Sequence, residues 1–265
     1  MAGNERLRSM IETGASVVGA TTGAILGAVT GDPTLGVGAT AVSASGAYQR
    51  AGSEIADRLL GPREAARVGA VLALSAQVLA EKVKQGHTLR DDGFLDTPPN
   101  GRSDADEVLE SVLRKAQTEY EERKLPYLSR LWANACIYKE HSGADLNHLV
   151  RLAEHLTYRD LTIISLVGEY AKSPGKNFYE RRSQSYQAGN QRERIDEAYM
   201  VMAAITKLSG LDCVNVNAMG NIQYSRCSVD IGTCGTALFH LMELHRIPQE
   251  ERQHIASLFR ITNRS

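Results

Sequence analysis

The sequence lacks an excess of charge of either sign, which limits what the chain can bind. Its 30 Lys and Arg residues stand against 31 Asp and Glu residues, for a formal net charge of −1. Proteins that hold nucleic acid by bulk electrostatic attraction carry a clear positive excess. The composition therefore argues against a general nucleic-acid binder, although it remains compatible with a local basic patch.

Cysteine is also scarce, and the residues present form no metal or redox motif. The four cysteines, Cys136, Cys213, Cys227 and Cys234, include no CxxC pair and no nearby His at zinc-ligand spacing. We therefore expect no bound metal. Three of the four lie in the last third of the chain, where one disulfide would form in an oxidising compartment. Reduced cytoplasmic thiols are the expected state.

The usual catalytic motifs are missing as well. The sequence contains no Gly-rich phosphate loop that ends in Gly-Lys-Ser/Thr, no GxSxG and no HExxH. Arg90 with Asp91 and Asp92 is compatible with a metal or phosphate site, but such a cluster usually marks a capped, solvated helix end. We predict that the chain is not an enzyme, has no catalytic residues and uses no cofactor.

A stripe of glycines is the most specific feature that is present. Gly19, Gly23, Gly27 and Gly31 follow one another at four-residue spacing, beside a parallel ridge of Ala20, Ala24 and Ala28. Residues four apart lie on one face of an α-helix, so one whole face of this helix is small. Each glycine costs a helix interior about 1 kcal/mol relative to alanine. The pattern therefore predicts a glycine-zipper helix over 13–31 that packs closely against another helix.

Gly31-Asp32-Pro33 then predicts a break between two helices, with Asp32 and Pro33 in the turn. The second arm, from Thr34 to about Leu60, is again rich in small residues, including Gly38 and Gly46. Asp32 is the only formal charge between Thr13 and Gln49. We expect an antiparallel helical hairpin that associates with or inserts into a membrane conditionally, as a homo-oligomer, because its length and apolarity are marginal for a span.

Two alternatives apply to this segment. A soluble hairpin would use the same glycines to pack tightly within a compact core. A cleaved signal peptide is the lesser alternative: Arg6 and Arg8 precede the apolar run and Ala39-Thr-Ala41 resembles a cleavage site, but the run is rich in Gly and Thr and follows Glu12.

The rest of the chain predicts mainly helices. Pro62 opens a helix that ends near Gly86, with an uncharged centre over 68–80 that we expect to be buried. Ser103 is placed to cap a helix that runs to about Arg123, and Pro126 to open one in which Trp132 is a core anchor. Short helices are expected over 146–155 and after Thr157, whose spacing to Asp160 resembles a capping box.

The C-terminal third predicts a winged-helix-like α+β region. A loop over 172–190 leads into a helix that ends at Ser209-Gly210, followed by a β-hairpin of 211–217 and 222–229 around a turn at 218–221. Helices over 233–244 and from Pro248 complete the chain. We divide it into a glycine-zipper hairpin over 1–61, a helical domain over 62–143 and a winged-helix-like domain over 144–265.

The helix before the wing would occupy the recognition-helix position, with Arg192, Arg194 and Lys207 as its exposed cations. Lys172, Lys176, Arg181 and Arg182 add positive charge in the preceding loop. These residues are candidates for contact with the phosphates of nucleic acid or lipid headgroups. Glu193, Asp196 and Glu197 reduce the charge of the helix, so we favour a winged helix that contacts protein, or a solvated loop, over one that binds DNA.

Three segments carry a resemblance. These are Lys124-Leu-Pro-Tyr-Leu-Ser-Arg-Leu-Trp-Ala-Asn134, the stretch from Leu152 through Leu156-Thr-Tyr-Arg-Asp-Leu161-Thr-Ile-Ile164, and Val229-Asp-Ile-Gly232 with Leu238. Together they resemble bacterial Abi-alpha (abortive-infection) proteins over about residues 105–245. In that family, segments of this kind precede a helix-and-wing region. The resemblance implies a bacterial phage-defence setting.

We therefore expect a bacterial effector of abortive infection, cytoplasmic but associated with the inner membrane through its hairpin. Its helical and winged parts would bind a partner or trigger that the sequence does not identify. The alternative is a soluble winged-helix regulatory module that binds DNA or a protein.

Overall fold

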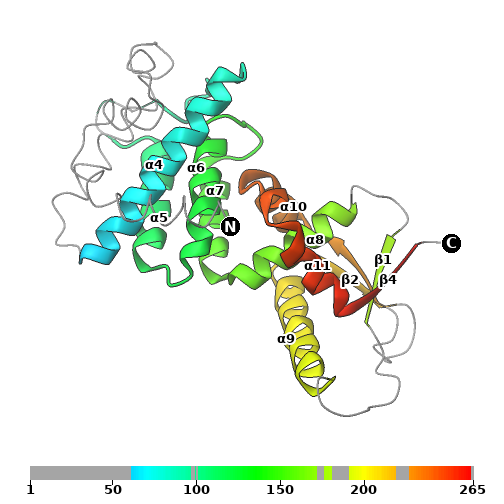
Figure 1. Ribbon diagram of the computed structural model, residues 1–265. Coiled ribbons are helices and arrows are strands. Elements are labelled where there is room, and N and C mark those ends of the chain that lie inside the picture. The colour runs from blue at the N-terminus through cyan, green and yellow to red at the C-terminus, as the bar shows by residue number, and fades with distance from the viewer. Residues whose placement is uncertain are drawn as a thin grey trace. The chain divides into compact units, whose positions relative to one another are not determined.

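The computed structural model describes residues 61–96, 99, 101–171, 176–180, 191–218 and 227–263 (Figure 1). Within them the chain is mainly helical, with small antiparallel two-stranded sheets in its C-terminal part, as the sequence predicts at this level. The predicted glycine-zipper hairpin and its turn at Asp32 and Pro33 lie outside the described residues. So do Arg181 and Arg182.

The chain divides into two compact units, one up to His155 and one from Leu156. The sequence predicts this boundary after Gly143. The helix that follows Gly143 packs on a helix of the first unit, which is why the division falls later.

The first unit is a helical bundle. Its elements are α4 (Pro62–Lys84), α5 (Asp104–Thr118), the short 3-10 helix η2 (Glu122–Lys124), α6 (Leu125–Ala135) and α7 (Gly143–His155). Helix α4 packs against α6 and α5, and α5 packs against α7. The uncharged centre of α4 is largely buried and Trp132 is fully buried, which confirms both predictions.

Helix starts in this unit agree with their sequence signals. The Ser103 hydroxyl accepts a hydrogen bond from Asp106 N, while the Asp106 carboxylate accepts one from Ser103 N. This reciprocal capping box fixes the start of α5. The helix ends at Thr118, earlier than expected, and Glu119 then adopts an extended backbone. Its carboxylate pairs with the buried ammonium of Lys124 at 2.5 Å.

The second unit is built around α8 (Tyr158–Ala171), which is buried over most of its length. The remaining elements are β1 (Lys176–Glu180), α9 (Gln191–Gly210), β2 (Val214–Ala218), β3 (Cys227–Ile231), α10 (Thr233–Leu241), the 3-10 helix η3 (Leu244–Arg246), α11 (Gln249–Ser257) and β4 (Phe259–Asn263). Helices α9, α10 and α11 and strand β3 all pack on α8. A Cβ atom at Gly168 of α8 would lie 2.4 Å from the Phe239 ring, so glycine allows this close approach.

An antiparallel strand pair is confirmed in the region of the predicted hairpin, as β2 and β3, but both strands lie later in the chain than predicted. Val214 lies opposite Ile231, and Ala218, which was predicted in the turn, lies opposite Cys227. A second antiparallel pair corrects the predicted loop over 172–190. Residues Lys176–Glu180 of that range form β1, which pairs with β4 at the other end of the unit. A strand that pairs with a segment so distant in the sequence gives no local signal of its partner.

Candidate functional site

Helix α9 presents the most distinctive surface of the second unit. Three apolar residues on its C-terminal half, Val201, Ile205 and Leu208, are buried in the unit. Tyr199 and Met200 are instead 66% and 59% exposed, and Ala203 beside them is also exposed. In Figure 1 this helix (yellow) extends beyond α8 and α11. Large apolar side chains exposed together on one helix are typical of a contact surface.

The C-terminal end of α9 is attached to the unit by an ion pair. Lys207 Nζ lies 2.7 Å from Asp160 Oδ2 on α8. The same carboxylate accepts a hydrogen bond from Thr157 N, and Asp160 N donates one to Thr157 Oγ1. Asp160 is only 2% exposed, so its charge requires these partners. This confirms the predicted cap of α8.

Lys207 is exposed, as predicted, but its ammonium also neutralises the buried Asp160 carboxylate. No local sequence pattern indicates this pairing, since the two residues lie on different helices. A second contact joins α9 to α11: His254 Nε2 lies 2.8 Å from Glu197 Oε1.

The other predicted contact residues are spread over separate elements. Lys176 begins β1, opposite Asn263 of β4. Arg192 and Arg194 lie near the start of α9. The structure therefore brings Arg192 and Arg194 onto the helix that also carries Tyr199 and Met200. The predicted zipper residues, together with Arg181 and Arg182, lie outside the described part of the chain.

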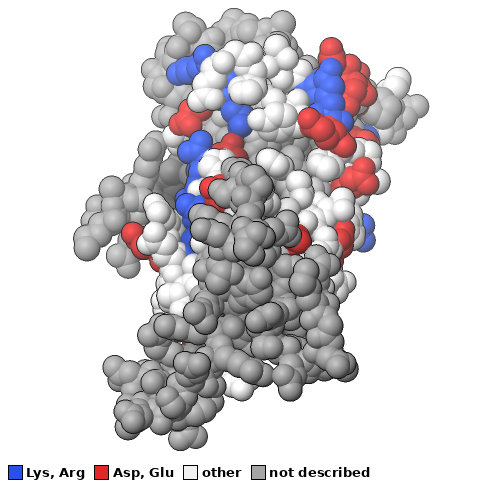
Figure 2. Space-filling model, turned by 90° about the vertical axis from the view of Figure 1, so that its right-hand side faces the viewer, with Lys and Arg blue, Asp and Glu red and all other residues white. Residues whose placement is uncertain are grey.

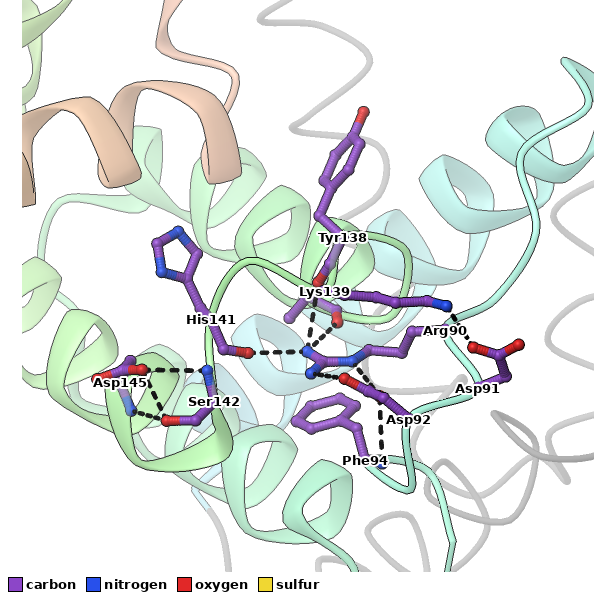
Figure 3. Close-up of polar contacts among 10 residues, drawn as sticks. Arg90, Asp91, Asp92, Phe94, Tyr138, Lys139, His141, Ser142 and Asp145 are labelled. Atoms are coloured by element: carbon purple, nitrogen blue, oxygen red, sulfur yellow. Dashed lines mark hydrogen bonds and ion pairs between the residues drawn. The ribbon is translucent and has the colours of Figure 1, made fainter.

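The cluster at Arg90 corrects a prediction in the first unit (Figure 3). Arg90 is 6% exposed and forms two hydrogen bonds to the Asp92 carboxylate, of 2.8 and 2.5 Å. Its Nη1 donates to the backbone carbonyls of Ala135, Tyr138 and His141. The Phe94 ring lies against the guanidinium, 4.3 Å from its carbon.

This arrangement joins the segment after α4 to the loop between α6 and α7. The guanidinium is occupied by protein acceptors, so Arg90 is neither a phosphate ligand nor solvated, whereas Asp91 and Asp92 are exposed. Hydrogen bonds from Arg90 lower the pKa of Asp92 to about 2. Hydrogen bonds from Ser142, at the start of α7, likewise lower the pKa of Asp145.

Charges on the described surface are mixed. Figure 2 shows one face of the molecule, on which basic and acidic side chains are interspersed among the described residues. Within the described part of the chain, no group of three or more His, Cys, Asp and Glu side chains is arranged to hold a metal ion. None of the helices described there is both long enough and apolar enough to cross a membrane.

Sequence reasoning missed Tyr199 and Met200, which it treated as part of an amphipathic helix. Their adjacency to Val201 conceals the pattern, because consecutive apolar residues point in different directions around a helix. No protein-family model, curated protein or solved structure matches this chain.

Proposed function

We propose that this chain is a non-catalytic bacterial defence effector of the abortive-infection type. Its N-terminal glycine-zipper hairpin associates with the inner membrane as an oligomer, and its helical units respond to a partner. One observation carries the proposal: Gly19, Gly23, Gly27 and Gly31 stand at strict four-residue spacing, along and directly after an uncharged segment that runs from Thr13 to Thr30. The resemblance to Abi-alpha proteins over about 105–245 supports the defence setting.

The physical argument concerns packing within lipid. Lipid tails are as apolar as leucine, so helices associate there by close backbone contact and not by exclusion of water. A face made of glycine and alanine permits that contact. The segment is 18 residues long, close to the roughly 20 that a span requires. Its threonines and glycines lower its apolarity, so it gains most from entering the membrane together with helical partners.

Leakage from liposomes tests this proposal. We expect full-length wild-type protein to release an entrapped dye from vesicles of bacterial phospholipid, and Gly23→Leu and Gly27→Leu to reduce release at least tenfold. Each leucine would separate the helices at their closest approach. Thr21→Leu is the matched control, because it adds the same side chain to the opposite face of the same helix.

The thermal unfolding of each variant is also measured, to show that the helices outside the glycine zipper still fold in that variant. Wild-type leakage in both glycine variants would overturn the zipper mechanism. Cell fractionation gives the independent readout. The proposal requires wild-type protein in the inner-membrane fraction, at least after induction of toxicity, and recovery of the chain only in the soluble fraction would contradict it.

A second candidate function is a winged-helix module that binds a protein. The order of α8, α9 and the β2–β3 hairpin matches a winged helix-turn-helix, in which α9 would be the recognition helix. The exposed side chains Tyr199 and Met200 favour a protein over DNA as the partner, since Tyr and Met are enriched in protein interfaces. The ammonium of Lys207 is already paired with Asp160, which reduces the positive charge that the helix offers to phosphate.

A comparison of α9 variants tests this candidate. We expect Tyr199→Glu with Met200→Glu to abolish recovery of a bound protein in affinity purification from host cells. Tyr120→Glu is the matched control, because Tyr120 is an even more exposed aromatic residue that lies in the first unit. Identical recovery by all three proteins would exclude α9 as the contact surface. Salt-sensitive binding to duplex DNA, lost when Arg181, Arg182, Arg192 and Arg194 are replaced by Ala, would support DNA as the partner.

A further inference from the structure

The junction between β2 and α10 holds two cysteines close together. Strands β2 and β3 pair up to Val214 and Ile231, and the next residues continue the contact, because Gly232 N donates to Cys213 O at 3.0 Å. Cys213 therefore lies just before the start of β2, and Cys234 lies in the first turn of α10.

The start of α10 is tied to this junction by an unusual cap. Gly232, the residue before the helix, makes no side-chain cap. The Asp212 carbonyl instead accepts hydrogen bonds from Cys234 N at 3.1 Å and Gly235 N at 3.3 Å. Asp212 has φ 52°, a left-handed backbone that Asp tolerates better than most residues. The first free N–H groups of α10 are thus satisfied by the residue next to Cys213.

Gly235 shows how closely the two backbones approach. A Cβ atom at Gly235 would lie 1.9 Å from the Cys213 carbonyl oxygen and 3.1 Å from its Cα. A disulfide needs Cα atoms about 4.4–6.8 Å apart. The hydrogen bond from Cys234 N to the carbonyl of the peptide that precedes Cys213 limits the separation of the two Cα atoms to about this range. Cys213 is buried, whereas Cys234 is partly exposed and accessible to a small oxidant.

We propose that Cys213 and Cys234 form a reversible disulfide that fastens the base of the β2–β3 hairpin to α10 under peroxide stress. The more exposed Cys234 thiolate attacks the peroxide O–O bond, which breaks to give a sulfenic acid and release hydroxide. The Cys213 sulfur then attacks the Cys234 sulfur and displaces its hydroxyl group as water. The two thiols lose two electrons to the peroxide, and thiol reductants of the cytoplasm reverse the bond.

The reaction is slow at neutral pH for a structural reason. Burial raises the pKa of Cys234 and raises that of Cys213 to about 12, and the thiolate is the reactive form. We therefore expect the bond to form faster as the pH rises from 7 to 9. The closed loop would contain the whole β2–β3 hairpin, so the bond restrains the unfolded chain and raises Tm by roughly 5–10 °C. This inference does not depend on the proposed function.

Peptide mapping of the full-length protein tests the pairing. Wild-type protein is treated with hydrogen peroxide, its remaining thiols are blocked with N-ethylmaleimide, and it is digested without reduction. We expect one linked peptide pair that joins Cys213 to Cys234, together with a rise in Tm that dithiothreitol reverses. The Cys227→Ser variant should retain both results, and Cys213→Ser and Cys234→Ser should lose both.

A linked pair that involves Cys227 in place of either partner would overturn the proposal. So would complete blocking of all four thiols by N-ethylmaleimide after exhaustive peroxide treatment at pH 9. These readouts use wild-type protein, so they stand even if a serine variant fails to fold.

Discussion

Arg90 illustrates how the fold uses a charge at the scale of a single residue. Its guanidinium donates to the Asp92 carboxylate and to carbonyls at the end of α6 and in the loop that follows. A buried cation without such acceptors would cost several kcal/mol, and here each acceptor is a protein group. The side chain therefore fixes two loops that are far apart in the sequence.

Removal of this side chain should destabilise the first unit. We expect Arg90→Ala to lower the free energy of unfolding by about 3 kcal/mol, because it leaves buried carbonyls without a donor. Arg90→Lys should recover only part of the loss, since lysine cannot form the two parallel hydrogen bonds to Asp92. Denaturant unfolding of each variant tests the expected order of stability, in which wild type is most stable, Arg90→Lys is intermediate and Arg90→Ala is least stable.

Lys139→Ala is the control, because it removes the exposed ion pair with Asp91 nearby and should leave stability unchanged. The pH dependence gives a second check. The pKa of Asp92 is about 2 in the folded chain, below the value of about 3.9 in the unfolded chain. The ionised Asp92 therefore contributes to folding stability above pH 4, and this contribution is lost as the pH falls toward 2. The difference in free energy of unfolding between wild type and Arg90→Ala should narrow over that pH range. An Arg90→Ala protein as stable as wild type would contradict the structural role.

At the scale of elements, α8 organises the second unit and α9 is attached to it at one end. The Thr157–Asp160 capping box starts α8, and Lys207 of α9 pairs with the same carboxylate. One acidic side chain thus sets the start of one helix and positions the end of another. Tyr199 and Met200 lie on the part of α9 farther from this attachment, where they are exposed.

Replacement of Asp160 should separate these two roles. Asp160→Ala removes both the cap and the ion pair, and we expect it to cost about 2 kcal/mol. Asp160→Asn keeps an acceptor for Thr157 N and should cost about half as much. Hydrogen exchange should show faster exchange in the last turns of α9 in both variants. If Asp160→Ala is as stable as wild type and hydrogen exchange in α9 is unchanged, the Asp160–Lys207 ion pair does not contribute to the stability of the second unit.

At the scale of the whole molecule, the chain combines two folded units with an apolar N-terminal sequence of a different character. Most apolar residues of the described helices are buried within their own units, as in the uncharged centre of α4. The segment over 13–49 has a single formal charge and a stripe of glycines. The liposome experiment with Gly23→Leu and Gly27→Leu belongs to this scale, because it asks whether that segment acts on lipid.

Local patterns predicted a large part of the fold. Pro62, Ser103 and the Thr157–Asp160 spacing located helix starts, because caps and N-terminal prolines act within one turn of the chain. The sequence also predicted the β2–β3 pair, although it placed both strands several residues too early in the chain. The β1–β4 pair was missed because its strands lie at opposite ends of the second unit.

By itself, the sequence determined which segments form helices, where Trp132 lies and how the glycines are spaced along 13–31, since these depend on neighbouring residues. Only the tertiary structure decided that Arg90 is buried, that Lys207 neutralises Asp160, and that Tyr199 and Met200 remain in water. Those outcomes depend on which elements meet, and side chains distant in the chain determine the environment of each charge. The packing of helices and loops thus assigns Arg90 and Lys207 to structural roles, although both resemble surface cations in the sequence.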